Sequence, residues 1–146
     1  MIEVAGYSGT PLAKKLGFKE GSRIRISNAP DNYLALVSPR PENVQISKAF
    51  RKNIDSWHFF TRSSVELSTQ LPKQLKAIRQ NGMIWVSWPK KASKEPTDVT
   101  ENVIRKVALP LGLVDVKVCA VDDTWSGLKL VIRKELRKWQ SQNHRS

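Results

Sequence analysis

The sequence has one cysteine, two histidines and no apolar run near the length of a membrane span. The lone Cys119 excludes an internal disulfide framework, and its place in an expected strand indicates a structural thiol rather than a nucleophile. Neither His58 nor His144 has a partner at metal-ligand spacing, so we expect no metal site. Met1–Val4 lacks the basic flank of a signal peptide. These absences predict a cytoplasmic, bacterial protein with no membrane contact.

Acidic residues are also few, since 13 Asp and Glu stand against 25 Lys and Arg and leave a net charge of +12. This imbalance favours acidic partners. The basic residues are spread along the chain, however, which is typical of a solvated surface. The alternatives for a partner are therefore an anionic small molecule and a nucleic acid. Nothing in the sequence indicates an oligomeric state.

Hydrophobic residues make up 40% of the 146-residue chain, enough for one domain with a real core. We expect a single domain over residues 1–134 and a basic tail over 135–146. Strand and helix patterns alternate along the domain. Strands are expected at 23–27, 44–46, 57–60, 83–88, 114–121 and 128–132, and helices at 10–17, 33–37, 63–79 and 98–111.

The strand at 83–88 is apolar almost throughout and lies between two amphipathic helix patterns, which is typical of a parallel strand covered on both faces. The last two strands are too close in sequence for a crossover and must pair antiparallel. The pattern therefore predicts an α/β fold: a three-layer, Rossmann-like sandwich with a mainly parallel sheet and an antiparallel C-terminal hairpin.

Helix boundaries follow from short local signals. Thr10, Ser63 and Asp98 stand at expected N-caps, the last two with a glutamate three residues later. Pro72 interrupts the pattern of the third helix, so we expect a kink or two abutting helices there. Gly82 is expected to end that helix.

Four segments together resemble a bacterial family known as Domain of Unknown Function 3052. They are Gly6–Gly17, Ile84–Lys90, Ala108–Asp115 and Trp125–Leu130. The similarity extends from about Gly6 to Lys134. It implies a fold and a family, and it assigns no catalytic residue.

The order of elements at the end of the chain is also similar to the second half of class I methyltransferases, in which the final strand inserts antiparallel beside its predecessor. This likeness is one of topology and not of motif. It implies a reduced, methyltransferase-like Rossmann domain.

The glycine-rich loop of a working Rossmann domain is missing. The loop after the first strand, 28–32, contains no glycine, and Pro30 removes an amide donor. Ser47 and Lys48 follow the second strand, where an acid would hold the ribose. Both departures argue against ordinary NAD or S-adenosylmethionine binding, so we expect no cofactor.

The best candidate for a ligand site is the segment after the strand at 83–88. Trp88, Lys90 and Lys91 combine an aromatic ring with two ammonium groups, which suits a phosphorylated or base-bearing ligand. Asn28 ends the first strand at the same edge of the sheet. The alternative is that Trp88 lies at the core edge and the lysines belong to a solvated loop.

The loop of the C-terminal hairpin adds Asp122, Trp125 and Ser126 to the candidate ligand site. The pair Asp122-Asp123 is compatible with acid–base or metal chemistry. Turn formation explains adjacent aspartates equally well, so we assign no catalytic or metal-binding residue.

These observations favour a non-enzymatic binding or regulatory module for an anionic ligand or partner. Two alternatives stay open. One is a degenerate S-adenosylmethionine-dependent, methyltransferase-like enzyme, and the other is a nucleic-acid-associated protein.

Overall fold

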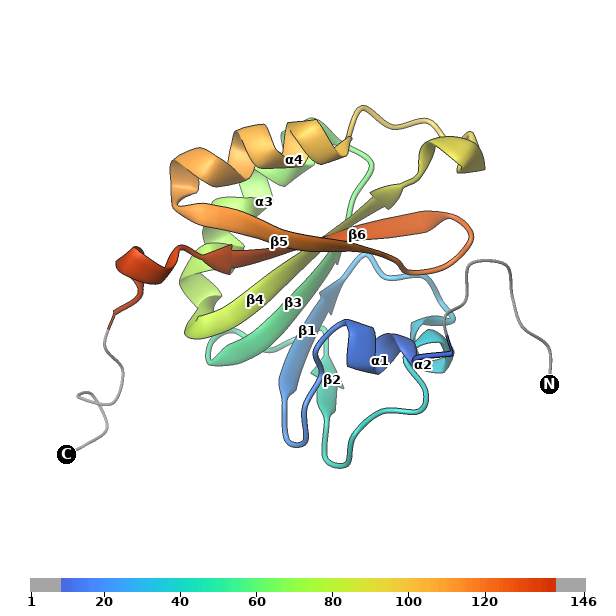
Figure 1. Cartoon of the computed structure of the whole chain (residues 1–146), viewed down its shortest axis with the longest axis vertical. Helices are drawn as coiled ribbons and strands as arrows, with labels where there is room; N and C mark the ends of the chain where they lie inside the picture. Colours follow the sequence, from blue (N-terminus) through green and yellow to red (C-terminus); the bar gives the residue numbers. More distant parts are fainter. Residues whose placement is uncertain (1–8, 139–146) are drawn as a thin grey trace.

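The structure, a computed structural model, describes residues 9–138 and forms one six-stranded sheet in the order β2-β1-β3-β4-β6-β5 (Figure 1). The strands are β1 (Arg23–Ser27), β2 (Gln45–Ser47), β3 (Ile54–Phe60), β4 (Ile78–Pro89), β5 (Leu113–Ala120) and β6 (Trp125–Ile132). The helices are α1 (Leu12–Lys15), α2 (Tyr33–Leu36), α3 (Ser64–Ala77) and α4 (Glu101–Ala108). Three 3₁₀ turns are η1 (Lys91–Ser93), η2 (Leu109–Leu111) and η3 (Lys134–Leu136).

Pairing within the sheet follows the predicted scheme. Strand β1 pairs parallel with β2 and β3, and β3 pairs parallel with β4. Strand β6 lies between β4 and β5 and runs antiparallel to both. The predicted fold class, a mainly parallel Rossmann-like sheet with an antiparallel C-terminal hairpin, is therefore confirmed.

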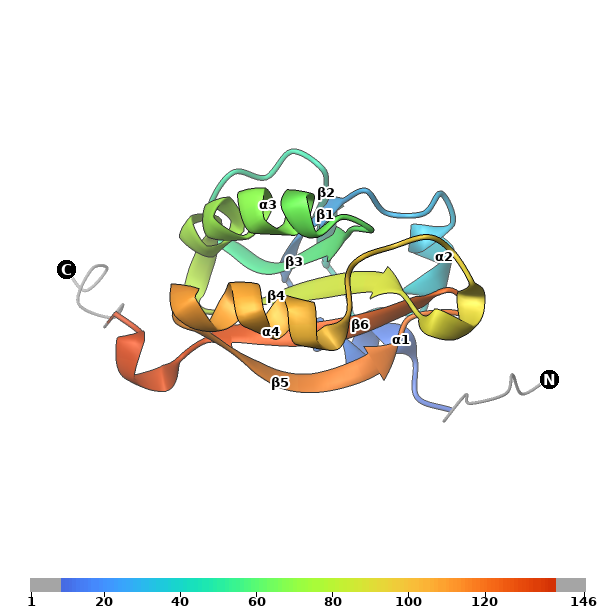
Figure 2. The same ribbon diagram turned by 90° about the horizontal axis from the view of Figure 1, so that it is seen from above.

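Helices cover both faces of the sheet (Figure 2). Leu67 and Leu71 of α3 and Ile104 of α4 are fully buried in one apolar cluster. Leu16, directly after α1, and Tyr33 of α2 belong to a second cluster on the other face. Because α1 and α2 are only four residues each, whereas α3 has 14 and α4 has eight, the face that carries α1 and α2 is the one with less helical cover. None of the helices within residues 9–138 is long and apolar enough to cross a membrane.

Two predicted helix starts are corrected by the structure. Asp98 does not cap α4: its carboxylate accepts hydrogen bonds from Ser64 N (2.7 Å) and Ser64 Oγ (2.6 Å) and so supports the start of α3. The cap of α4 is Thr100, whose Oγ1 accepts from Val103 N. At the first helix the N-cap position falls on Pro11 rather than Thr10. Ser63 caps α3 as predicted.

Of the two alternatives expected at Pro72, two abutting helices are excluded, because α3 runs through it as one helix of 14 residues. Proline costs the helix one backbone hydrogen bond, and the burial of Leu67 and Leu71 around it holds the helix together. The predicted end at Gly82 is wrong. The helix ends at Ala77, and Gly82 lies inside β4.

Gly82 belongs to an irregular stretch of β4. Ile54 pairs with Ile78, whereas Ser56 pairs with Met83, so residues 79–82 bulge out between two paired positions. A Cβ on Gly82 would lie 3.0 Å from both Arg79 O and Asp55 O and 3.1 Å from Ile54 O. Backbone oxygens cannot rotate away as a flexible side chain can. The close approach of these strands therefore requires glycine.

We predict that Gly82→Ala lowers the free energy of unfolding by about 1–3 kcal/mol, the usual cost of overpacking a tight site. Urea denaturation followed by circular dichroism measures the change. The matched control is Asn81→Ala, because the Asn81 side chain is exposed and its truncation is expected to change stability by less than about 0.5 kcal/mol. Equal stabilities for the two variants would contradict the prediction.

Between β2 and β3 the chain crosses as a loop, residues 48–53, where a Rossmann domain ordinarily has a helix. Figure 2 shows this loop on the side of the sheet that carries α3. Phe50 is half-buried against the cluster under α3 and α4. The loop is therefore anchored by one aromatic side chain, and it leaves the polar face of β1 open at its edge.

Candidate functional site

Asn28 connects the carboxyl ends of β1 and β3 through side-chain hydrogen bonds. Rossmann domains bind their ligand at these strand ends. Asn28 has a positive φ of 59°, a conformation that asparagine adopts more readily than most residues. Its Nδ2 donates to Phe60 O (3.0 Å) and to Glu66 Oε2 (3.2 Å). The side chain thus fills with hydrogen bonds the place where a glycine would let a ligand approach the backbone.

Glu66 is itself held on two sides. Its Oε1 accepts from Thr61 Oγ1 at 2.6 Å, and its backbone N donates to Ser63 Oγ at 3.1 Å. Thr61 and Ser63 belong to the turn between β3 and α3. The carboxylate therefore holds both Thr61 and Asn28, and these hydrogen bonds account for its position without a ligand.

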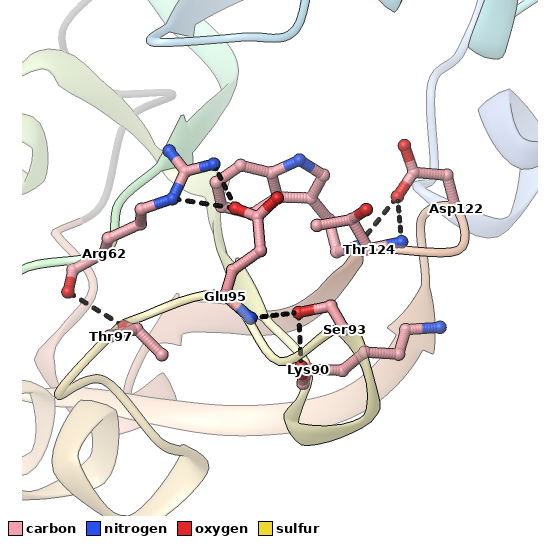
Figure 3. A network of polar contacts seen from close by, with 8 residues as sticks. Arg62, Lys90, Ser93, Glu95, Thr97, Asp122 and Thr124 are labelled. Carbon is pink, nitrogen blue, oxygen red and sulfur yellow. Dashed lines mark hydrogen bonds and ion pairs between the residues drawn. The ribbon is translucent and has the colours of Figure 1, made fainter.

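A second network covers the carboxyl end of β4 (Figure 3). Lys90 O accepts from Ser93 N and Ser93 Oγ, and Ser93 Oγ in turn accepts from Glu95 N. Farther along, Thr97 Oγ1 donates to Arg62 O at 2.8 Å. Residues 90–97 thus form a strap from the end of β4 to the turn after β3.

Arg62 connects the strap to the hairpin. Its guanidinium pairs with Glu95 (2.5 Å) and lies over the ring of Trp125, 4.8 Å from the centroid. The Trp125 ring in turn packs edge-on against Phe60, with 5.1 Å between centroids. Trp125 is only 7% exposed and Trp88 only 8%. Both tryptophans are thus part of the body and offer little free ring surface to a ligand.

The structure brings part of the predicted site together. Lys90 N donates to Thr124 O (2.8 Å), and Asp122 Oδ1 accepts from Thr124 N (2.9 Å) and Trp125 N (2.8 Å). Asp122 therefore shapes the hairpin turn. Lys91 is exposed, and Ser126 pairs with Trp88 across the sheet.

The chemistry of this edge offers no metal centre within residues 9–138, since no three His, Cys, Asp or Glu side chains gather there or elsewhere in that range. Burial raises the pKa of the Cys119 thiol, and the charges of Lys117 and Lys15 oppose that shift. The thiol is therefore protonated at neutral pH and weakly nucleophilic.

A buried polar relay crosses the centre of the sheet. His58 Nδ1 lies 2.8 Å from Tyr33 Oη, and His58 Nε2 lies 2.7 Å from Ser87 Oγ. A serine beside a histidine is the pair that nucleophilic catalysis uses. Both side chains are 0% exposed, so no substrate reaches them. Burial lowers the pKa of His58 to about 3, which keeps the imidazole neutral and makes the relay structural.

At the opposite edge of the sheet, the amino ends of β1 and β4 border a cavity of about 410 Å³. We call it the basic pocket. Its lining residues are Arg23, Ala49, Phe50, Arg51, Lys52, Asn53 and Arg79. Four of the seven carry a positive charge, and they come from β1, the loop 48–53 and the irregular stretch of β4.

Two arginines of β1 are stacked on aromatic rings beside the basic pocket. The guanidinium of Arg23 lies 4.0 Å from the centroid of Phe50, and that of Arg25 lies 4.5 Å from the centroid of Trp57. Arg25 also donates to Phe50 O. Burial lowers the pKa of Arg25, and the neighbouring charge of Arg51 lowers it further.

One acid, Asp55, balances part of this charge. Its Oδ1 lies 3.0 Å from Arg79 Nε, and its Oδ2 accepts from Arg23 N at 2.8 Å. No ion pair within residues 9–138 includes Arg51 or Lys52. The sequence patterns do not reveal the basic pocket, because its residues are spread from position 23 to position 79.

Solved structures resemble this fold at very low sequence identity. A candidate methyltransferase from Thermoplasma acidophilum matches with a TM-score of 0.53 and 8% identity over 86% of this chain and 75% of its own. A protein of the NADB-Rossmann superfamily from Streptococcus agalactiae matches with a TM-score of 0.53 and 10% identity over 90% of this chain and 70% of its own. These likenesses show a methyltransferase-like Rossmann fold.

One larger protein, LepI, shares this fold. LepI, in a complex with SAH and a substrate analogue, matches with a TM-score of 0.51 and 10% identity over 84% of this chain. The chain spans 39% of the length of LepI and 58% of a ribosomal protein L11 methylase from Lactobacillus delbrueckii subsp. bulgaricus. No protein-family model and no curated protein sequence matches the chain. The resemblance to Domain of Unknown Function 3052 therefore stays a prediction.

Proposed function

We propose that this chain is a methyltransferase-type Rossmann domain that binds an anionic ligand or partner and performs no methyl transfer. The observation that carries the proposal is the side chain of Asn28. Its hydrogen bonds to Phe60 O and Glu66 occupy the ends of β1 and β3, the region that holds the methyl donor in domains of this type. Pro30 has no amide to offer there, and Lys48 stands where an acid would hold a ribose.

The charge of the chain supports the anionic part of the proposal. A net charge of +12 on 146 residues raises the local concentration of anions and speeds their association. Cations are present at both edges of the sheet, Lys90 and Lys91 at the carboxyl edge and the basic pocket at the amino edge. The candidate set Asn28, Trp88, Lys90, Lys91, Asp122, Trp125 and Ser126 remains our proposal for the carboxyl edge.

A second function is favoured by the topology. The strand order and the likeness to LepI, solved with SAH, support an S-adenosylmethionine-dependent enzyme with an unusual loop. Such an enzyme would need Asn28 to swing away from Phe60 O and Glu66 before the cofactor enters. That movement costs two hydrogen bonds, one of them to a carboxylate.

Thermal denaturation with added ligands separates the two functions, because a ligand that binds only the folded state raises its stability. We expect a panel of nucleotides and phosphorylated metabolites to raise Tm, and S-adenosylmethionine and SAH at about 1 mM to leave it unchanged. A saturable rise in Tm with either adenosyl compound would favour the methyltransferase-like enzyme over the binding module. If no anion of the panel raises Tm, the proposal that the chain is an anion-binding module is wrong.

A further inference from the structure

We infer that the basic pocket is a binding site for a small molecule that carries two or more phosphate groups. This inference rests on the proposed function and gives it a place and a ligand class. The pocket lies at the amino ends of the parallel strands, opposite the edge at which Rossmann domains hold their ligands. It is therefore separate from the carboxyl-edge residues discussed above.

The chain builds the pocket by two departures from a regular Rossmann domain. A loop replaces the helix between β2 and β3, so Arg51 and Lys52 stand exposed beside the open face of β1. The bulge at residues 79–82 then turns the start of β4 toward Asp55, where Arg79 forms its ion pair. Three segments that are distant in sequence thus contribute cations to one cavity.

Part of the pocket is preorganised for anions. Stacking on Phe50 fixes the plane of the Arg23 guanidinium, and Asp55 holds both Arg79 and the backbone of Arg23. The Nε of Arg23 is buried and has no hydrogen-bond partner within residues 9–138. A guanidinium held in one plane by stacking is suited to the planar, two-point contacts that phosphate oxygens make.

Charge and size narrow the ligand class. Four cationic side chains line the pocket, and Asp55 pairs with only one of them. A cavity of about 410 Å³ is within the usual range for small ligands, roughly 300–1,000 Å³, and exceeds what a single phosphate fills. The ring of Phe50 is already covered by Arg23, so recognition depends on charge rather than on base stacking. A compact oligophosphate group meets these conditions.

Isothermal titration with sodium tripolyphosphate at 50 mM salt tests the site. We expect Arg51→Ala/Lys52→Ala to weaken binding by about tenfold or more, because each replaced cation removes a charge-assisted contact. Both side chains are exposed, so the double variant is expected to keep the wild-type melting curve. In amide NMR spectra of the wild type, the ligand is expected to shift the signals of Arg23, residues 50–53 and Arg79.

The matched control is Lys14→Ala/Lys106→Ala, which removes two positive charges from exposed side chains of α1 and α4, outside both candidate sites. It is expected to change the affinity by less than about twofold. Equal or larger weakening in this control overturns the location and leaves the proposed function standing. Wild-type binding to a 20-base-pair DNA duplex without binding to tripolyphosphate overturns the ligand class. If the wild type binds neither tripolyphosphate, nor the DNA duplex, nor any anion of the panel, the proposed function itself is wrong.

Discussion

Lowering the pH from 7 to 5 is expected to reduce the free energy of unfolding by about 2 kcal/mol through His58 alone. Burial lowers the pKa of this imidazole from 6.5 to about 3 in the folded protein. Between those values the unfolded chain binds a proton that the folded chain does not bind. Stability is therefore complete above pH 6.5 and is lost as the pH falls, by about 1.4 kcal/mol per unit.

The surroundings of His58 explain why the imidazole stays neutral. Its ring stacks on Phe60 with 4.3 Å between centroids. Both of its nitrogens have hydroxyl partners, Tyr33 and Ser87, and neither hydroxyl carries a negative charge to stabilise the imidazolium, since burial raises the pKa of Tyr33.

Urea titrations at pH 7, 6 and 5 on the wild type and on His58→Gln measure this contribution. The amide is expected to lower stability at pH 7 and to flatten the dependence between pH 7 and 5. Hydrogen bonds from Ser64 and Arg105 hold the pKa values of Asp98 and Asp115 below their usual range. These two carboxyl groups change the free energy of unfolding only in more acidic solution. His144 is present in both the wild type and the variant, so it does not contribute to the difference between them. An equal slope in the variant would exclude His58 as the source.

Trp85→Ala is expected to lower the free energy of unfolding by about 3–5 kcal/mol, the usual cost of removing a buried aromatic side chain. Trp85 is 0% exposed in the middle of β4, and its Nε1 donates to Leu16 O at 2.9 Å. The variant loses this contact between the sheet and the end of α1, and it leaves a cavity beside Gly127, where a Cβ would lie 3.2 Å from the indole.

A second variant separates volume from hydrogen bonding. Trp85→Phe keeps most of the ring volume and leaves Leu16 O without its donor, which costs about 1–3 kcal/mol. We expect its stability to lie between those of the wild type and the alanine variant in urea denaturation. A loss below about 1 kcal/mol in Trp85→Ala would show that the α1 side of the sheet contributes little to folding.

Much of the fold is predictable because local patterns carry it. The apolar run at 83–88 and the alternation at 23–27 each specify a strand, and the short spacing before residues 128–132 forces an antiparallel hairpin. Helix caps were predicted less well. Asp98 has the right spacing to cap α4, yet its carboxylate accepts a hydrogen bond from Ser64 at the start of α3. No local sequence signal indicates such a long-range partner.

The basic pocket could not be predicted from sequence patterns either, because residues that are distant in sequence form it. Arg51 and Lys52 look like a solvated pair in the sequence, and Arg23 looks like the outward residue of an alternating strand. Only the loop that replaces a helix, together with the bulge before Met83, brings them next to Arg79. The predicted carboxyl-edge residues, by contrast, follow from the general rule for α/β sheets.

The loop at residues 48–53 also has a consequence for protein engineering. It joins two parallel strands, touches the body through Phe50, and otherwise presents exposed side chains from Arg51 to Asn53. Surface segments of this kind tolerate insertions well. An amphipathic helix grafted between β2 and β3 would replace this loop by the usual crossover helix and would cover Arg23 and Arg25. Such a helix needs acidic residues on its inner face, because a buried guanidinium is stable only when it is paired.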